Sequence, residues 1–310
     1  TVYIRARLTK QDKWGFIDQT GTWVIKPVYY YIPLPVSEGV FGCCRKPGAG
    51  SRFEYPSGKQ AIRNAFENLE SFSEGRAGVY RKRKWYFIDH KGHKTGRAYG
   101  DILSFREGRA AVMRGGFTGT TTCQFARGGF WGYIDKTGEE VIEPQFDKAG
   151  SFHEGLACVH IDGKREKYNH VIDSSAGFID KTGLMVIPAQ YDDASYFSEN
   201  RAAVLTGSQT AAGVGPNRWK DYIPEKNEYG GGKWGFINNK GEMKIQPVYD
   251  DYTDFSEGLA GVFIVDTWWL NENLISRRSS KKSDTTPYGL ENYRPSGNTV
   301  VNYLTVQCKG

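Results

Sequence analysis

The stretch Trp131–Ala157 reads WGYIDKTGEEVIEPQFDKAGSFHEGLA, and it decides the fold because the chain carries six copies of it. The pattern opens on Trp-Gly, which copies one, four and six keep, passes an Asp-x-x-Gly turn and a Val-Ile-x-Pro run, and closes on Phe-x-Glu-Gly. The copies lie near residues 13–42, 50–80, 84–113, 130–160, 176–206 and 233–264. Such a chain is a repeat architecture, in which each unit buries its apolar face only by stacking on its neighbours.

The recurring residues are expected to be structural, because catalysis normally uses one asymmetric constellation. The glutamates are expected to receive backbone N–H groups at their turns or to pair with a neighbouring unit, and the alternative is a ring of carboxylates that collects cations. The recurring residues are Trp14, Trp85, Trp131 and Trp234, Gly39, Gly75, Gly108, Gly155 and Gly258, and Glu38, Glu74, Glu107, Glu154, Glu199 and Glu257.

Each copy predicts about four short antiparallel strands. The Trp run alternates bulky residues on both faces, and the turn after it ends in a glycine suited to positive φ. The Asp that opens this turn can accept backbone N–H bonds. The following strand, such as 140–143, is expected to stop at Pro144. The link 80–84 is short enough to be a hairpin, so the number of strands per copy should be even.

This pattern predicts an all-β fold, most simply a six-bladed β-propeller-like ring, with an open stack of β-hairpin repeats as the alternative. Residues 1–265 form the repeat domain. Residues 266–310 form a partly flexible C-terminal tail with a possible terminal strand at 299–307. The chain begins partway through a unit, since Ala6-Arg7-Leu8 resembles the Ala-x-Val strand that ends other copies.

Composition narrows the class of protein. Aromatic residues make up 14% of the 310 residues, so much of the core must be Trp, Tyr and Phe. No apolar run approaches the ~20 residues that span a bilayer. The net charge of +6 permits an anionic partner without requiring one. Five cysteines without a CxxC pair indicate free thiols, and neither a metal site nor a cofactor is expected.

The Lys-Trp-Gly-Phe-Ile openings at 13–17 and 233–237, with the Asp-x-x-Gly turn, the Val-Ile-x-Pro strand and the Phe-Ser-Glu-Gly ending, resemble the WG, or KWG, repeat family of bacterial proteins. The match covers about residues 13–263. Copy two lacks Trp-Gly, copy three has Trp85-Tyr86, and copy five has Asn200 for Gly. The resemblance implies a repeat scaffold and no settled activity. The compartment stays open between cytoplasm and periplasm or secretion.

The insertions between copies all follow the Ala-x-Val strand and precede the next Trp strand. If the units share one orientation, these insertions emerge together at one end, which repeat proteins often use for binding. Drift in tolerant surface loops is the alternative. The candidate binding residues are Trp219, Tyr222, Tyr229, Trp268, Trp269, Arg81, Arg83, Arg277 and Arg278.

No catalytic motif is present: the chain lacks a Walker loop, a dinucleotide fingerprint, HExxH and GxSxG. The sequence therefore favours a non-enzymatic scaffold that binds another protein through variable loops at one end. The alternative is a glycan- or anion-binding module, or a hydrolase with a site at the same end. Nucleic acid is disfavoured, because neither basic run is interleaved with stacking aromatics.

Overall fold

The computed structural model describes residues 2–10, 12–118, 126–165, 171–207, 232–265 and 301–307. None of these residues is helical, and every paired strand runs antiparallel to its neighbour. The predicted all-β fold built from short antiparallel strands is confirmed.

Seven sheets follow one another along the described chain, and we number them 1 to 7 in that order. Sheet 1 contains β1 (Ile4–Ala6), β2 (Trp14–Ile17) and β3 (Trp23–Tyr29). Sheet 2 contains β4 (Phe41–Cys43) and β5 (Arg52–Glu54). Sheet 3 contains β6 (Asn68–Leu69), β7 (Ala77–Arg81), β8 (Lys84–Ile88) and β9 (Lys94–Tyr99). Sheet 4 contains β10 (Asp101–Ile102), β11 (Ala110–Thr118), β12 (Ala126–Ile134) and β13 (Glu140–Phe146).

The C-terminal half continues the same order. Sheet 5 contains β14 (Lys148–Ala149), β15 (Leu156–Ile161), β18 (Ser175–Asp180) and β19 (Met185–Tyr191). A small hairpin of β16 (Lys164–Arg165) and β17 (Val171–Ile172) interrupts it. Sheet 6 contains β20 (Asp193–Ala194), β21 (Ala202–Thr206), β22 (Lys233–Ile237) and β23 (Met243–Tyr249). Sheet 7 contains β24 (Asp251–Tyr252), β25 (Leu259–Val265) and β26 (Val301–Gln307).

The sheets are offset from the sequence copies by half a unit. A copy begins at the third strand of one sheet, as Trp131 does in β12, and ends at the second strand of the next, as Ala157 does in β15. The described chain therefore has seven sheets where one sheet per copy would give six. Each copy therefore supplies strands to two consecutive sheets and connects them covalently.

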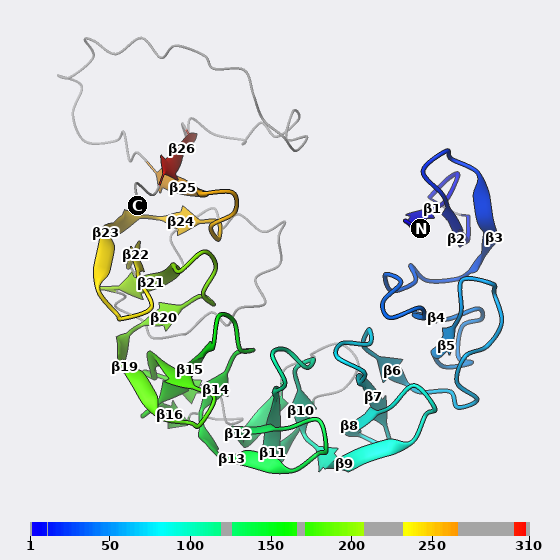
Figure 1. Ribbon diagram of the computed structural model, residues 1–310, viewed down its shortest axis with the longest axis horizontal. Coiled ribbons are helices and arrows are strands. Elements are labelled where there is room, and N and C mark those ends of the chain that lie inside the picture. Colours follow the sequence, from blue (N-terminus) through cyan, green and yellow to red (C-terminus); the bar gives the residue numbers. More distant parts are fainter. Residues whose placement is uncertain are drawn as a thin grey trace, which may run out of the picture.

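The sheets lie side by side along an arc around a central hollow, as in a β-propeller (Figure 1). The short first strands β6, β10, β14, β20 and β24 border the hollow, and β9, β13, β19 and β23 form the outer edge (Figure 1). In this view sheets 1 and 7 do not meet, so the described sheets form an open arc.

The apolar core lies between consecutive sheets. One cluster joins Phe87 of sheet 3 to Ala110, Val112 and Ile134 of sheet 4. The Trp-Gly pair requires glycine for a steric reason, because a Cβ on Gly132 would lie 2.4 Å from the carbonyl oxygen of Ile142. The pairing of β12 with β13 shifts register beside this glycine, which marks a bulge.

The outer strands run through their prolines, which corrects the prediction that the strand ends at Pro144. Strand β13 continues to Phe146, and β3, β19 and β23 likewise contain Pro27, Pro188 and Pro247. These are edge strands, where a proline removes no ladder bond if its nitrogen faces outward. Proline on an outer edge also discourages pairing with another chain.

Candidate functional site

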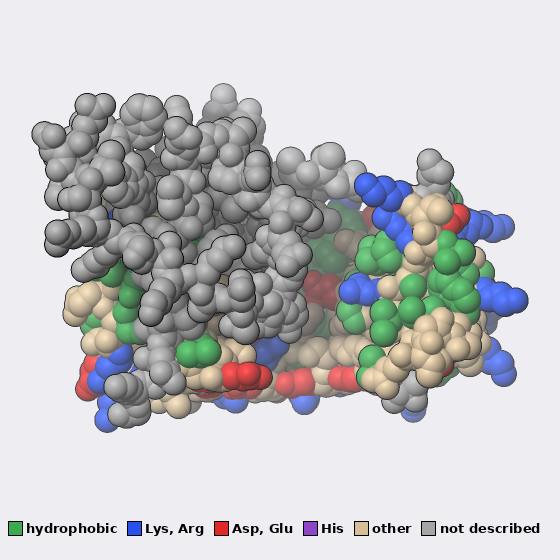
Figure 2. Space-filling view, turned by 90° about the horizontal axis from the view of Figure 1, so that it is seen from above, with side chains coloured by type: hydrophobic (Ala, Val, Ile, Leu, Met, Phe, Trp, Pro, Cys, Tyr) green, Lys and Arg blue, Asp and Glu red, His purple; other side chains and the backbone are tan. Residues whose placement is uncertain are grey.

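The glutamate turns lie at one end of the molecule, which we call the glutamate end, and they are hydrogen-bonded to one another. Each of the first five glutamate carboxylates accepts a bond from the backbone N–H of the next copy's turn. The bonds run from Gly75 to Glu38, Gly108 to Glu74, Gly155 to Glu107, Asn200 to Glu154 and Gly258 to Glu199, at 2.8–3.1 Å. Figure 2 shows acidic side chains in a row along one edge of the molecule.

Two lysines and a histidine from the Asp-x-x-Gly hairpins add a second contact to three of these carboxylates. Lys136 lies 3.0 Å from Glu74, Lys181 lies 3.1 Å from Glu107, and His90 lies 2.9 Å from Glu38. Burial alone would raise the pKa of Glu74 and Glu107, but the bonds from these lysines and from the turn N–H groups hold the pKa of both below the ordinary value. The glutamate end is therefore internally paired.

The opposite end, which we call the loop end, carries the connections between the second and third strands of the four-stranded sheets and the matching connection between β4 and β5. Because the second strand starts at a glutamate turn, it must finish at the other end. The described connections differ in length, from the two-residue turn of β7–β8 to the long hairpin β11–β12, which pairs out to Thr118 and Ala126. The loop end therefore has the asymmetry that the glutamate end lacks.

The tightest connection is a basic hairpin tip. Residues 81–84 are Arg-Lys-Arg-Lys, and all four are exposed. Lys82 and Arg83 have φ of 52° and 62°, values that Asn and Gly adopt more easily in a two-residue hairpin. The N–H of Lys82 donates to the carboxylate of Glu67. Within the described ranges, no carboxylate forms an ion pair with any of the four cations. The predicted residues Arg81 and Arg83 both belong to this tip.

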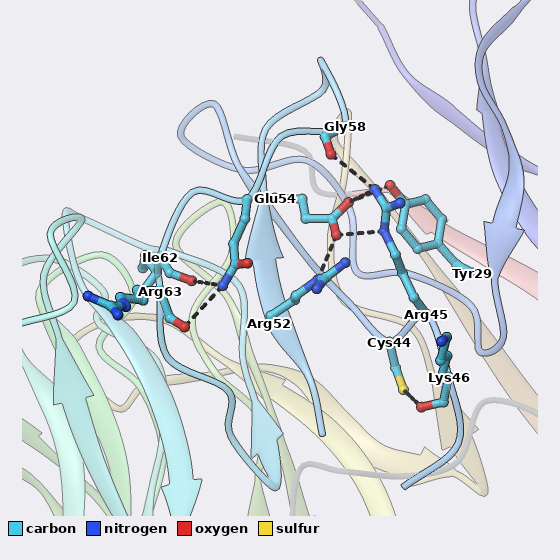
Figure 3. A network of polar contacts seen from close by, with 10 residues as sticks. Tyr29, Cys44, Arg45, Lys46, Arg52, Glu54, Gly58, Ile62 and Arg63 are labelled. Carbon is cyan, nitrogen blue, oxygen red and sulfur yellow. Dashed lines mark hydrogen bonds and ion pairs between the residues drawn. The ribbon is translucent and has the colours of Figure 1, made fainter. Parts of the chain in front are cut away.

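Sheet 2 holds a buried carboxylate where the other sheets hold isoleucine. Glu54 is fully buried and occupies the position of Ile17, Ile88, Ile134, Ile179 and Ile237 in the other copies. Arg45 donates Nε and Nη2 to its two oxygens, both at 2.8 Å, and Arg52 donates Nε at 2.7 Å (Figure 3). The Tyr29 hydroxyl donates at 2.8 Å from sheet 1, so the network also joins two sheets.

Burial and hydrogen bonds together set the pKa values of the ionisable groups in this network. Burial alone would raise the pKa of Glu54, yet hydrogen bonds from Arg45 and Tyr29 hold it below the ordinary value. Burial, together with the adjacent Glu54 carboxylate, raises the pKa of Tyr29 and raises that of the Cys43 thiol to about 12. Glu54 therefore stays ionised and Cys43 stays a neutral, unreactive thiol at neutral pH.

An exposed aromatic pair lies beside this network at the loop end. Tyr30 and Tyr31 are 51% and 57% exposed, pack edge to face with centroids 5.1 Å apart, and precede the exposed Ile32. The N–H of Tyr30 bonds the carbonyl of Cys44, next to Arg45. Copies four, five and six have Asp or Lys at the positions of Tyr30 and Tyr31. Figure 2 shows hydrophobic side chains gathered on the N-terminal arm with Lys and Arg beside them.

A Ser-His-Asp chain joins sheets 5 and 6. The Ser174 hydroxyl lies 3.0 Å from Nδ1 of His160, and Nε2 of His160 lies 3.2 Å from Asp193. The three residues are 3–4% exposed, so a substrate could not reach the hydroxyl. The chain satisfies buried polar groups and ties the base of a connection to the neighbouring sheet.

The other predicted binding residues lie outside the described residues. These are Trp219, Tyr222, Tyr229, Trp268, Trp269, Arg277 and Arg278. Sequence reasoning missed Tyr30, Tyr31, Arg45 and Glu54. The signal was present in the alignment of copy two, where a charged residue replaces a repeat isoleucine.

The described part of the chain has neither a metal-binding cluster nor a membrane-spanning helix. No group of three or more His, Cys, Asp or Glu side chains there is placed to hold a metal ion. No helix there is long and apolar enough to cross a membrane.

Two solved structures are similar to this chain. A eukaryotic initiation factor superposes with a TM-score of 0.51 at 11% identity, over 82% of this chain and 66% of that chain. The tricorn protease gives 0.41 at 11% identity, over 81% of this chain and 31% of that one. The chain thus spans slightly less than two thirds of the first structure and about a third of the second. The first likeness supports a propeller-like fold alone.

Comparison with sequence families gives a more specific result. No curated protein matches the chain. The family model of the WG-containing repeat matches residues 14–42, 131–164, 177–208 and 234–268. These segments coincide with copies one, four, five and six. The structure gives copy three the same strands and turns, and copy two keeps the turns but has only isolated bridges where its outer strand would lie. The chain belongs to the WG-repeat proteins.

Proposed function

We propose that this protein is a non-enzymatic repeat scaffold that binds a protein partner through its loop end. The observation that carries the proposal is the contrast between the two ends. The glutamate turns bond one another in a continuous series, so that end is occupied by its own contacts. The connections at the loop end are unequal in length and sequence, as binding loops on a rigid repeat scaffold are.

Lysine-directed cross-linking in extracts of the source organism tests this proposal, because lysines lie at both ends. Lys46, Lys82, Lys84 and Lys164 lie in loop-end connections, and Lys91, Lys136, Lys181 and Lys240 lie in the hairpins of the glutamate end. Mass spectrometry should find cross-links to one recurring protein at the loop-end lysines. Cross-links that map to the glutamate-end lysines instead would contradict the proposal.

A further inference from the structure

The connections of sheets 2, 3 and 4 are basic and contain no acidic residue. Residues 43–52, 81–84 and 113–129 together hold nine Lys and Arg and no Asp or Glu. The insertions 160–175 and 206–232 hold three basic and three acidic residues each. Nine positive charges exceed the net charge of the whole chain, +6, so the rest of the chain is net acidic. Among the described residues, Arg45 and Arg52 pair with Glu54 and Arg114 pairs with Glu140, so the remaining positive charge of these connections lies mainly at residues 81–84.

The hairpin tip keeps its cations at a conformational cost. Lys82 and Arg83 occupy the left-handed region, which carries a steric cost for a residue with a Cβ. Asn-Gly would serve the same turn without that cost. The tip carries four exposed cations that form no ion pair within the described ranges, although the Glu67 carboxylate accepts the N–H of Lys82. It provides a compact positive charge on a rigid support.

The arginines of sheet 2 are pre-oriented by the buried carboxylate. Arg45 and Arg52 both bind Glu54, yet 36% and 34% of their side chains remain exposed. Two guanidiniums on one carboxylate leave a net positive charge at the surface. The Arg45 guanidinium also donates to the carbonyl of Gly58 at 3.0 Å. The exposed Tyr30, Tyr31 and Ile32 are tied to the same connection by the bond from the Tyr30 N–H to the carbonyl of Cys44.

We infer that the loop end over sheets 1 to 3 binds an acidic peptide segment of a protein partner, whose carboxylates meet residues 81–84 and whose apolar side chains meet Tyr30 and Tyr31. This inference rests on the proposed function and names the chemistry of its partner. Charge complementarity of this kind sets association rate and specificity. An exposed tyrosine pair supplies contact area at small entropic cost.

A peptide fits these observations better than a nucleic acid. Tyr30 and Tyr31 pack edge to face at 80° against each other, an arrangement that does not offer parallel platforms for successive bases. Residues 81–84 form one compact tip, whereas binding a strand requires cations that follow its backbone. Arg45 already recognises a carboxylate through two parallel bonds within this protein.

Fluorescence anisotropy with the full chain tests the inference. The probe is a short labelled peptide of alternating glutamate and leucine, compared with its glutamine analogue and with an oligothymidylate of equal charge. Binding should be strongest for the acidic peptide and should weaken at about 0.5 M salt, where the screening length falls to about 4 Å. The double variant Lys82→Asn, Arg83→Gly should weaken it about fivefold, as the loss of two surface ion pairs implies.

This variant separates binding from folding, because Asn-Gly suits the turn and should leave the melting temperature unchanged or higher. The matched control, Lys91→Asn with Lys240→Asn, removes the same charge from the glutamate end and should bind as the wild type does. The variant Tyr30→Ser, Tyr31→Ser should weaken binding of the leucine-containing peptide more than binding of a polyglutamate.

Two results would overturn the inference: equal loss of binding in the control variant, or oligothymidylate binding at least as tightly as the acidic peptide. If either occurs while cross-links still map to the loop end, the partner chemistry is wrong and the proposed function stands. If the cross-links also map to the glutamate end, both are wrong.

Discussion

Glu54 is one charged residue at a position that holds isoleucine in the other copies, and it gives the second copy a buried ion-pair network. An isoleucine at this position is buried between sheets in copies three to six, and Glu54 fills the same place in the second copy. Desolvating a carboxylate costs several kcal/mol, and the attraction of two arginines and a tyrosine offsets that cost only while all the bonds are made. The network is therefore sensitive to the loss of the charge at its centre.

The substitution Glu54→Gln should lower the free energy of unfolding by at least about 2 kcal/mol, because it leaves Arg45 and Arg52 without their anion. The effect is moderated because both arginines are partly exposed. The double variant Glu54→Ile, Arg52→Gly, which restores the residues of other copies, should be less destabilising. Urea denaturation of both variants measures the difference. A Gln variant as stable as the wild type would show that the network contributes no net stability.

The Asp-x-x-Gly hairpin is the element that the sequence predicts best, because its contacts are local. Asp135 accepts bonds from the N–H groups of Thr137 and Glu139, and Asp18 and Asp180 repeat this pattern. In all three, the adjacent threonine hydroxyl and these N–H groups hold the pKa below its ordinary value. Asn238 makes the same backbone bonds in copy six.

These lowered pKa values predict a direction for the stability of the protein against pH. Each carboxylate contributes stability fully above its unfolded pKa of about 3.9 and loses it as pH falls through the lower folded pKa. The melting temperature should therefore drop below about pH 4. In the triple variant Asp18→Asn, Asp135→Asn, Asp180→Asn the drop should be shallower, since Asn keeps the turn without titrating. An equally steep drop would place the acid sensitivity elsewhere.

Elements that depend on distant partners could not be predicted in the same way. The half-unit offset between copies and sheets arises because β11 pairs with β12 of the next copy, a choice that no single copy encodes. Strands continue through their prolines because they are edge strands, which is a property of the assembled sheet. Likewise, the Glu54 carboxylate accepts hydrogen bonds from Tyr29 of sheet 1 and from Arg45 in the β4–β5 connection. The local sequence of the second copy shows a charged residue at this position but not these partners.

At the scale of the whole molecule, the glutamate bonds connect sheets 2 to 7 in one series, with one such contact between each sheet and the next. Each bond joins one copy to the next, with sequence separations from 34 to 59 residues. A repeat protein is held by nearest-neighbour interfaces, so a bond at each interface resists opening of the arc between sheets. A rigid arc keeps the loop-end connections in fixed positions relative to one another.

The middle of this series should therefore be more sensitive than its last member. Glu107→Ala removes the bond to Gly155 and the ion pair with Lys181, and should lower the free energy of unfolding by about 1–2 kcal/mol. Glu257→Ala is the matched control, because its φ of 55° resembles the 51° of Glu107 and no described residue bonds its carboxylate. Hydrogen exchange should show the Gly155 amide exchanging faster in the first variant only. Similar losses in both variants would mean that the backbone turn, rather than the bond between copies, carries the effect.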